Sequence, residues 1–286
     1  STTQTGAIIT DNNFTGLTNA NTGNATDFGF YGKYVESSTT KYAGLYYDAS
    51  TDKTYEILKK YQKHNKNIII LENNNKLSIK RVENISNARN LILNYIKKDN
   101  VKYKYEYFIM MDFDDVCSND IKINILDEVL QKKDKWDSIS FNKAGYYDIW
   151  ALAYNKFIIS WQHIFQNKSN AILYLNDVKK NISNDLKKNK FLEVESAFNG
   201  FAIYKTNKFL HDDIYYDFKF KKNIDLFNET ELIKNINYIN NNNFNETISI
   251  NNLKYNMIDD CEHKYFHKMA KIINNCKIII YNKNIF

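Results

Sequence analysis

The chain has 286 residues, long enough for one large domain or for a domain with an appendage, and it can bury an apolar core of its own. Its net charge is +6, but 37 of its 39 basic residues are lysines spread along the sequence, so no basic stripe predicts nucleic-acid binding. The three cysteines, Cys117, Cys261 and Cys276, lack metal-type spacing and indicate thiols in a reducing compartment, not a disulfide scaffold.

Neither membrane insertion nor secretion by a signal peptide is expected. No apolar stretch approaches the roughly 20 residues of a membrane-spanning helix. The first residues, STTQTGAIIT, lack the basic and apolar regions of a signal peptide. We therefore expect a soluble, cytoplasmic protein.

The N-terminal part differs in composition from the remainder. Residues 1–54 hold six of the eight glycines and 12 of the 15 threonines, whereas residues 55–286 hold 36 of the 39 basic residues. Short aromatic and β-branched runs between Gly, Thr and Asn turns predict strands. The stretch DFGFYGKYVESSTTKYAGLYYDAS is similar to β-rich modules of viral or phage fibre and surface proteins. We expect a β-rich segment over residues 1–42, either an appended module or part of the domain that follows.

From residue 43 to the C-terminus, short apolar runs alternate with helical segments. This pattern predicts an α/β domain over residues 43–286, with a mostly parallel sheet flanked by helices. The predicted strands cover residues 43–48, 67–72, 105–112, 137–141, 146–153, 199–206 and 276–281. The predicted helices cover residues 50–64, 84–98, 119–133 and 261–274, and an Asn-rich loop is expected over residues 235–247.

The most informative motif is YFIMMDFDDV, in which Asp112, Asp114 and Asp115 follow an apolar strand. Asp112 and Asp114 lie two residues apart and would share a face at the carboxyl end of the strand, where open α/β sheets bind ligands. Like charges this close repel each other, and a hard cation such as Mg²⁺ or Mn²⁺ removes the repulsion. The alternative is a solvated acidic loop.

Six motifs in order resemble those of GT-A type glycosyltransferases, which depend on nucleotide-sugars and include relatives encoded by large DNA viruses. They are DASTDKT, NARN, YFIMMDFDDV, YYDIWAL, NGFAIYKT and CEHKYFH, and they span residues 43–281. The resemblance implies a Rossmann-like mixed sheet and hexosyltransferase-like transfer from a UDP- or GDP-sugar to a hydroxyl acceptor on a glycan, protein or lipid. It also implies that Asp112 and Asp114, assisted by Asp115, hold Mn²⁺ or Mg²⁺ against the diphosphate.

Further residues are expected to contact the nucleotide. The resemblance implies that Asp48 and Ser50 do so, although helix capping accounts equally well for Ser50. Arg81 and Arg89 are the only arginines, and their planar forks suit phosphate; the alternative is a structural ion pair, for Arg89 with Asp112 or Asp115. Gly200 permits a close backbone approach to a ligand or marks a simple turn.

The remaining candidates concern the sugar, the acceptor and the metal. Tyr147, Asp148 and Trp150 suit a sugar pocket, although aromatic runs are more often core. The resemblance implies that His263 completes the metal site, with Glu262 or Asp260 as a base for the acceptor hydroxyl. A zinc pair of His263 and His267 is an alternative that lacks a third ligand.

Two other functions are compatible with the same motifs. A haloacid-dehalogenase-type phosphatase would use Asp112 as its nucleophile, although two strand–helix units precede that motif here. A non-catalytic viral fibre or surface binding protein with a degenerate enzyme domain is the third possibility.

Overall fold

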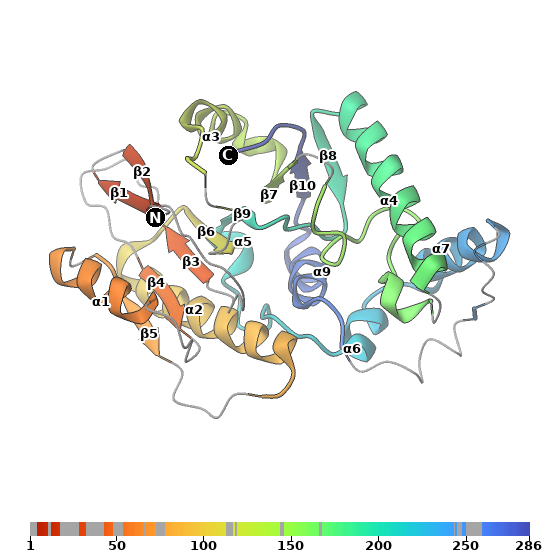
Figure 1. The fold of residues 1–286 in the computed structure, drawn as a ribbon, viewed down its shortest axis with the longest axis horizontal. Coiled ribbons are helices and arrows are strands. Elements are labelled where there is room, and N and C mark those ends of the chain that lie inside the picture. The colour runs from red at the N-terminus through yellow and green to blue at the C-terminus, as the bar shows by residue number, and fades with distance from the viewer. Residues whose placement is uncertain are drawn as a thin grey trace. The chain divides into compact units, whose positions relative to one another are not determined.

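The computed structural model describes residues 5–10, 13–17, 29–32, 43–47, 54–65, 67–72, 78–112, 117, 119–143, 146–165, 168–242, 244, 248–249 and 259–286. The chain divides into two compact units. The first unit takes in residues 1–134, 200–212 and 285–286, and the second takes in residues 135–199 and 213–284. Figure 1 labels their elements.

The first unit contains a mixed five-stranded sheet. Its order is β5 (Ile70–Glu72), β4 (Ala43–Tyr47), β3 (Gly29–Gly32), β6 (Tyr107–Asp112) and β9 (Phe201–Lys205). Strands β4 and β5 are parallel, β3 is antiparallel to both β4 and β6, and β9 is antiparallel to β6. Consequently β4, β5 and β6 end at the same edge of the sheet. A separate antiparallel pair joins β1 (Thr5–Thr10) to β2 (Asn13–Leu17).

Helices flank this sheet. They are α1 (Thr54–His64), α2 (Arg81–Tyr103), α3 (Ile123–Leu130) and the short α5 (Thr206–Phe209), with a 3₁₀ turn at Lys133–Lys135. Helix α2 lies along β3 and β4. Its buried apolar residues follow the i, i+3, i+7, i+8 pattern of one helix face: Val82, Ile85, Ala88, Ile92, Leu93 and Ile96. All six residues of β6 are buried, which explains its unbroken apolar run up to Asp112.

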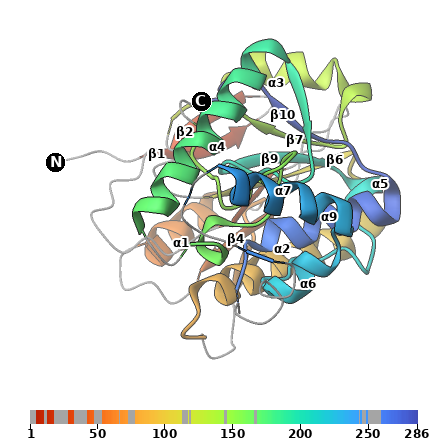
Figure 2. The same cartoon turned by 90° about the vertical axis from the view of Figure 1, so that its right-hand side faces the viewer.

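The second unit contains three strands and four α-helices among its described residues. Strand β10 (Ile278–Tyr281) lies between β7 (Ser138–Phe141), to which it is parallel, and β8 (Phe191–Val194), to which it is antiparallel. The helices are α4 (Lys168–Lys188), α6 (Phe220–Asp225), α7 (Glu229–Asn241) and α9 (Glu262–Asn274), with a 3₁₀ turn at Trp161–His163. Figure 2 shows α6 beside α9, against which it packs.

The predicted α/β fold with a mixed sheet and flanking helices is confirmed. The expectation of a mostly parallel arrangement was wrong: among the strand pairs described above, only β4–β5 and β7–β10 are parallel, because β3 lies between β4 and β6 and is antiparallel to both. Strand β3, from the N-terminal segment, pairs with β4 on one side and β6 on the other. The boundary at residue 42 stays a prediction. No helix within the described ranges is long and apolar enough to cross a membrane.

Two local predictions were wrong. Residues 146–153 form no strand: Tyr146 has a φ of 38°, a turn covers residues 149–151, and only an isolated bridge joins Ala153 to Ser196. The expected Asn-rich loop is helical as far as Asn241. A capping box between Asn228 and Glu231 starts this helix, and its buried face outweighs the low helix propensity of asparagine. The 21-residue helix α4 was not predicted at all.

The end of α2 offers a test of the backbone geometry. Lys104 is exposed and ends α2 in the left-handed region, with φ 51° and ψ 58°. A side chain with a Cβ is disfavoured there by roughly 1–2 kcal/mol. Lys104→Gly is therefore expected to raise the free energy of unfolding by about 0.5–1 kcal/mol, measured by urea denaturation.

Asn275 provides the matched control, because it ends α9 with φ 49° and asparagine tolerates this region better. Asn275→Gly should give the smaller gain. Loss of stability in Lys104→Gly would contradict the left-handed cap.

Candidate active site

Asp112 is the last residue of β6 and is buried at the edge where β4 and β5 also end. Its backbone N–H donates to the carbonyl oxygen of Gly200, 2.8 Å away, next to β9. On the other side, Gly29 of β3 is its partner in the sheet. Gly200 has a φ of 85°, which a residue with a Cβ adopts only at a cost. No side chain therefore stands beside Asp112 on either neighbouring backbone.

Arg89 of α2 forms an ion pair with Asp112. Its Nη2 donates to Asp112 Oδ1 at 2.5 Å, and the side chains are only 8% and 12% exposed. Of the two roles weighed for Arg89, the ion pair is present in the structure, and phosphate binding stays a prediction. Arg81 lies at the exposed first position of α2, so the two arginines are eight residues apart on one helix.

The chemistry of Asp112 fits a hard divalent cation. A carboxylate has two oxygens with about four lone-pair sites, so it can accept a hydrogen bond from an arginine and bind a cation at the same time. Asp114 and Asp115 lie outside the described residues, as do Asp48 and Ser50, which directly follow β4. Among the residues that the structure does describe, no three His, Cys, Asp or Glu side chains form a metal-binding group. The metal site stays a prediction.

In the second unit, the loop after β7 carries the predicted sugar-binding residues. Tyr147 is exposed and Asp148 is half-buried, with Asp148 Oδ1 accepting from the N–H of Ala151 at 3.2 Å. Trp150 is half-buried, and its indole Nε1 is buried with no hydrogen-bond partner within the described part of the chain. A buried donor of this kind costs about 1–3 kcal/mol unless water or a ligand accepts from it.

Asn199, which the sequence analysis missed, holds this loop in place. Its Oδ1 accepts from the N–H groups of both Tyr147 and Asp148, each at 3.1 Å. Its Nδ2 donates to the carbonyl oxygen of Phe141, at the end of β7, at 2.7 Å. Its backbone is left-handed, with a φ of 58°. The Asn-Gly pair at 199–200 is a turn signal, and it is the sequence feature that points to Asn199.

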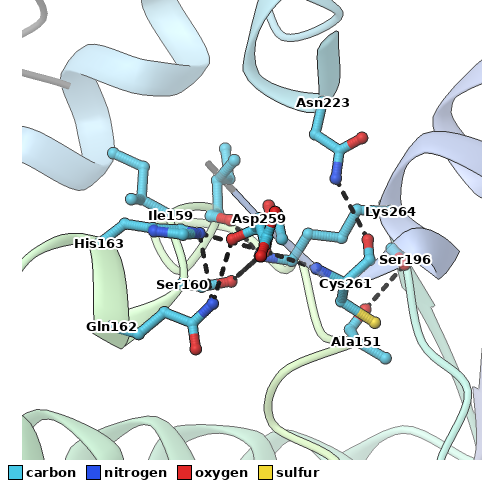
Figure 3. Close-up of polar contacts among 12 residues, drawn as sticks. Ala151, Ile159, Ser160, Gln162, His163, Ser196, Asn223, Asp259, Cys261 and Lys264 are labelled. Carbon is cyan, nitrogen blue, oxygen red and sulfur yellow. Dashed lines mark hydrogen bonds and ion pairs between the residues drawn. The ribbon is translucent and has the colours of Figure 1, made fainter. Parts of the chain in front are cut away.

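A buried polar cluster lies before α9 and centres on Asp260, which is 3% exposed. Asp260 Oδ1 accepts from Ser160 Oγ at 2.7 Å and lies 3.6 Å from Lys264 Nζ and 3.7 Å from His163 Nε2. Figure 3 shows Ser160, His163 and Lys264 pointing toward one another. Burial by itself raises the pKa of Asp260, but Lys264, His163 and the Ser160 hydroxyl outweigh it and lower the pKa to about 2.

The other two predicted residues of this region lie in the first turn of α9. Glu262 and His263 are 2% and 1% exposed, and Glu262 Oε1 lies 3.7 Å from His263 Nε2. The His263 ring stacks on Phe198, with 3.9 Å between the ring centroids. Their proposed roles in metal binding and proton transfer stay predictions.

The tautomer of His267 follows from its contact with Ser196. Ser196 Oγ donates its only proton to the carbonyl oxygen of Ala151 at 2.7 Å, and it lies 2.9 Å from His267 Nδ1. The histidine must therefore donate through Nδ1. This bond fixes the ring one helical turn after His263, and the zinc pair stays an untested alternative.

The role of Asn199 can be tested against a second left-handed asparagine. Asn199→Ala leaves two buried N–H groups without their acceptor and adds left-handed strain, so it is expected to lower the free energy of unfolding by about 2–4 kcal/mol. Asn155→Ala, at an exposed position with a φ of 51°, carries the strain alone and should cost about 1–2 kcal/mol. Equal losses in urea denaturation would contradict the hydrogen bonds of Asn199.

The low pKa of Asp260 predicts a pH dependence of stability. Because its pKa falls from 3.8 to about 2 on folding, the pair with Lys264 stabilises the protein above pH 3.8 and loses this contribution as pH falls toward 2. The double variant Asp260→Asn/Lys264→Met should lose less free energy of unfolding than the wild type over this window. Parallel curves in denaturant titrations at several pH values would contradict the pairing.

Comparison with known proteins gives information mainly on the region around Arg89 and Asp112. Residues 45–176 match the family model described as Glycosyl transferase family 2. The segment is just under half of the chain and contains Arg89, Asp112 and Asp148, but not Gly200 or the residues of α9. No curated protein and no solved structure matched the chain. The family match and the mixed α/β fold support a GT-A type glycosyltransferase.

Proposed function

We propose that the protein is a metal-dependent glycosyltransferase that moves a sugar from a UDP- or GDP-sugar to a hydroxyl group of a glycan, protein or lipid. One observation carries the proposal. Within the segment that matches the family, β6 ends in a buried carboxylate, Asp112, which is oriented by Arg89 and flanked by the backbones of two glycines.

The proposed donor site is built around that carboxylate. Asp112, with Asp114, Asp115 and His263 as further ligands, would hold Mn²⁺ or Mg²⁺. When bound, such an ion supplies Lewis acidity that stabilises the leaving diphosphate. Arg89 fixes the Asp112 carboxylate through Oδ1. Because the residues beside Asp112 on the two neighbouring backbones are glycines, Gly29 and Gly200, neither has a side chain that would crowd a ligand at this carboxylate. Asp48, Ser50 and Arg81 are the proposed nucleotide contacts.

The proposed sugar and acceptor contacts come from the second unit. Asn199 fixes the backbone of Tyr147 and Asp148, so an exposed aromatic ring and a carboxylate are presented from a rigid loop. The indole N–H of Trp150 is a donor suited to a sugar hydroxyl. Glu262 would accept the proton of the acceptor hydroxyl at a side-chain oxygen, or Asp148 would do so.

Donor binding can be tested by thermal unfolding and by donor hydrolysis. UDP- and GDP-sugars should raise the unfolding midpoint of the wild type only when Mn²⁺ or Mg²⁺ is present, because the diphosphate binds through the metal. Asp112→Asn should abolish this rise and lower metal-dependent sugar release by more than about 100-fold.

Glu106→Gln is the matched control. It removes a carboxylate just before β6, at the other end of the strand, whose Oε1 pairs with the exposed Lys133 at 2.9 Å and accepts from the Tyr107 hydroxyl at 2.8 Å. Glu106→Gln should behave like the wild type. The proposal fails if the protein neither binds nor turns over any sugar nucleotide. If it instead hydrolyses a phosphomonoester, and Asp112→Asn abolishes this hydrolysis, the phosphatase function replaces the proposal.

A further inference from the structure

Helix α9 begins without an ordinary cap. The side chain of its N-cap residue, Cys261, accepts no hydrogen bond from the backbone of the first turn, and its Sγ donates to Glu262 Oε2 at 3.8 Å. Instead, the carboxylate of the preceding residue, Asp260, accepts from the N–H of Cys261 at 2.8 Å. Asp260 therefore binds the backbone at the N-cap position, and Glu262 and His263 follow directly.

Lys264 completes the arrangement from inside the helix. It is 1% exposed, and its Nζ donates to Ser160 Oγ at 2.6 Å and to the carbonyl oxygen of Ile158 at 2.9 Å. Asp260 and Lys264 thus both bind Ser160, and they lie four residues apart, on either side of Glu262 and His263. A buried lysine is stable only when its charge is paired and its donors are satisfied.

Backbone contacts hold the same segment from two further directions. The N–H of Asp260 donates to the carbonyl oxygen of Phe218 at 2.6 Å, and Asn223 Nδ2 donates to the carbonyl oxygen of Cys261 at 3.2 Å. Gln162 Nε2 donates to the carbonyl oxygen of Asp259 at 3.3 Å. Figure 3 shows Gln162 and Asn223 reaching this segment from separate elements.

The same contacts argue against Asp260 as a general base. A base must reach the acceptor hydroxyl and have a carboxylate oxygen to receive its proton. Both Asp260 and Glu262 are buried, but only Asp260 has an oxygen, Oδ1, that accepts from Ser160 and from the N–H of Cys261 and faces the Lys264 charge at 3.6 Å. The ion pair stabilises the carboxylate in its charged form, which weakens it as a proton acceptor.

We propose that Asp260 and Lys264 are a buried pair of positioning residues that fixes the first turn of α9 and so places Glu262 and His263, and that Asp260 takes no proton from the acceptor. The catalytic part of this inference rests on the proposed glycosyltransferase function. The positioning part does not, because it follows from contacts within the second unit.

The test compares Asp260→Asn, Lys264→Met and the double variant with Glu262→Gln. Asp260→Asn keeps an oxygen that accepts from Ser160 and Cys261, but it leaves the buried charge of Lys264 without its opposite charge. Lys264→Met leaves the buried charge of Asp260 without its opposite charge. Each single variant should therefore lower the thermal midpoint more than the double variant does. Hydrogen exchange at the amides of residues 262–265 should be faster in the single variants and closer to wild type in the double variant.

Kinetics separate positioning from proton transfer. The double variant should lose about 10-fold or less in kcat with an unchanged KM for the nucleotide-sugar, whereas Glu262→Gln should lose more than about 100-fold in kcat. Asp177→Asn on α4 is the control, because it removes a carboxylate of the same unit that accepts from Asn181 at 3.1 Å and, among the contacts of the described residues, touches no residue of α9. It should leave kcat, KM and exchange at α9 unchanged.

Two results would overturn the proposal. One is a folded double variant whose kcat falls as far as that of Glu262→Gln, which would make Asp260 the base. The other is additive losses of thermal midpoint with unchanged exchange at the start of α9. If the wild type turns over no sugar nucleotide, the proposed function fails, while the midpoints and the exchange rates still decide whether the pair positions the helix.

Discussion

The proposed donor site depends on the buried ion pair between Arg89 and Asp112. An isolated carboxylate at the end of a fully buried strand would be costly, and the guanidinium of α2 offsets that cost at a distance of 2.5 Å. The pair also ties the helix to the strand whose end carries the acidic motif. Removing either partner would leave the other charge buried without compensation, so the position of this carboxylate is tied to the packing of the first unit.

The second unit solves a similar problem with a larger cluster. Lys264, His163 and Ser160 surround the Asp260 carboxylate, and the backbone of the same segment is held by Asn223. Two asparagines satisfy neutral backbone groups in a similar way, because the side-chain oxygen of each accepts from two successive backbone N–H groups. Asn199 accepts from those of Tyr147 and Asp148. Asn235 accepts from those of Ile158 and Ile159. Irregular loops can be buried here because side-chain amides satisfy backbone groups that no sheet or helix satisfies.

The fold class and many of the elements could be predicted because apolar periodicity is a local property. Six consecutive buried residues in β6 left an unbroken apolar run, and the buried face of α2 left a three-to-four spacing. The failures arose where local preferences lost to other contacts. Asparagines favour loops, yet α7 continues through them because Asn228 caps it and Leu232, Ile236 and Ile239 are buried. The YYDIWALA run has the composition of a strand, but Asn199 and Asp148 bind its backbone as a turn.

The sequence by itself determined where the polar residues of interest lie along the chain. They are the acids at the end of β6, the two arginines of the helix before it, and the acid–histidine run at α9. The sequence offered Asp112 or Asp115 as an ion-pair partner of Arg89, 23 residues away from Asp112, but could not choose between this pair and phosphate binding, and it offered no partner for Asp260, which binds Ser160 across 100 residues. Only the tertiary structure decided that Arg89 binds a carboxylate, that Asn199 holds a loop and that Asp260 is enclosed by Lys264. The physical reason is that the charge state and role of a buried polar group are set by its neighbours in space, which local sequence patterns do not encode.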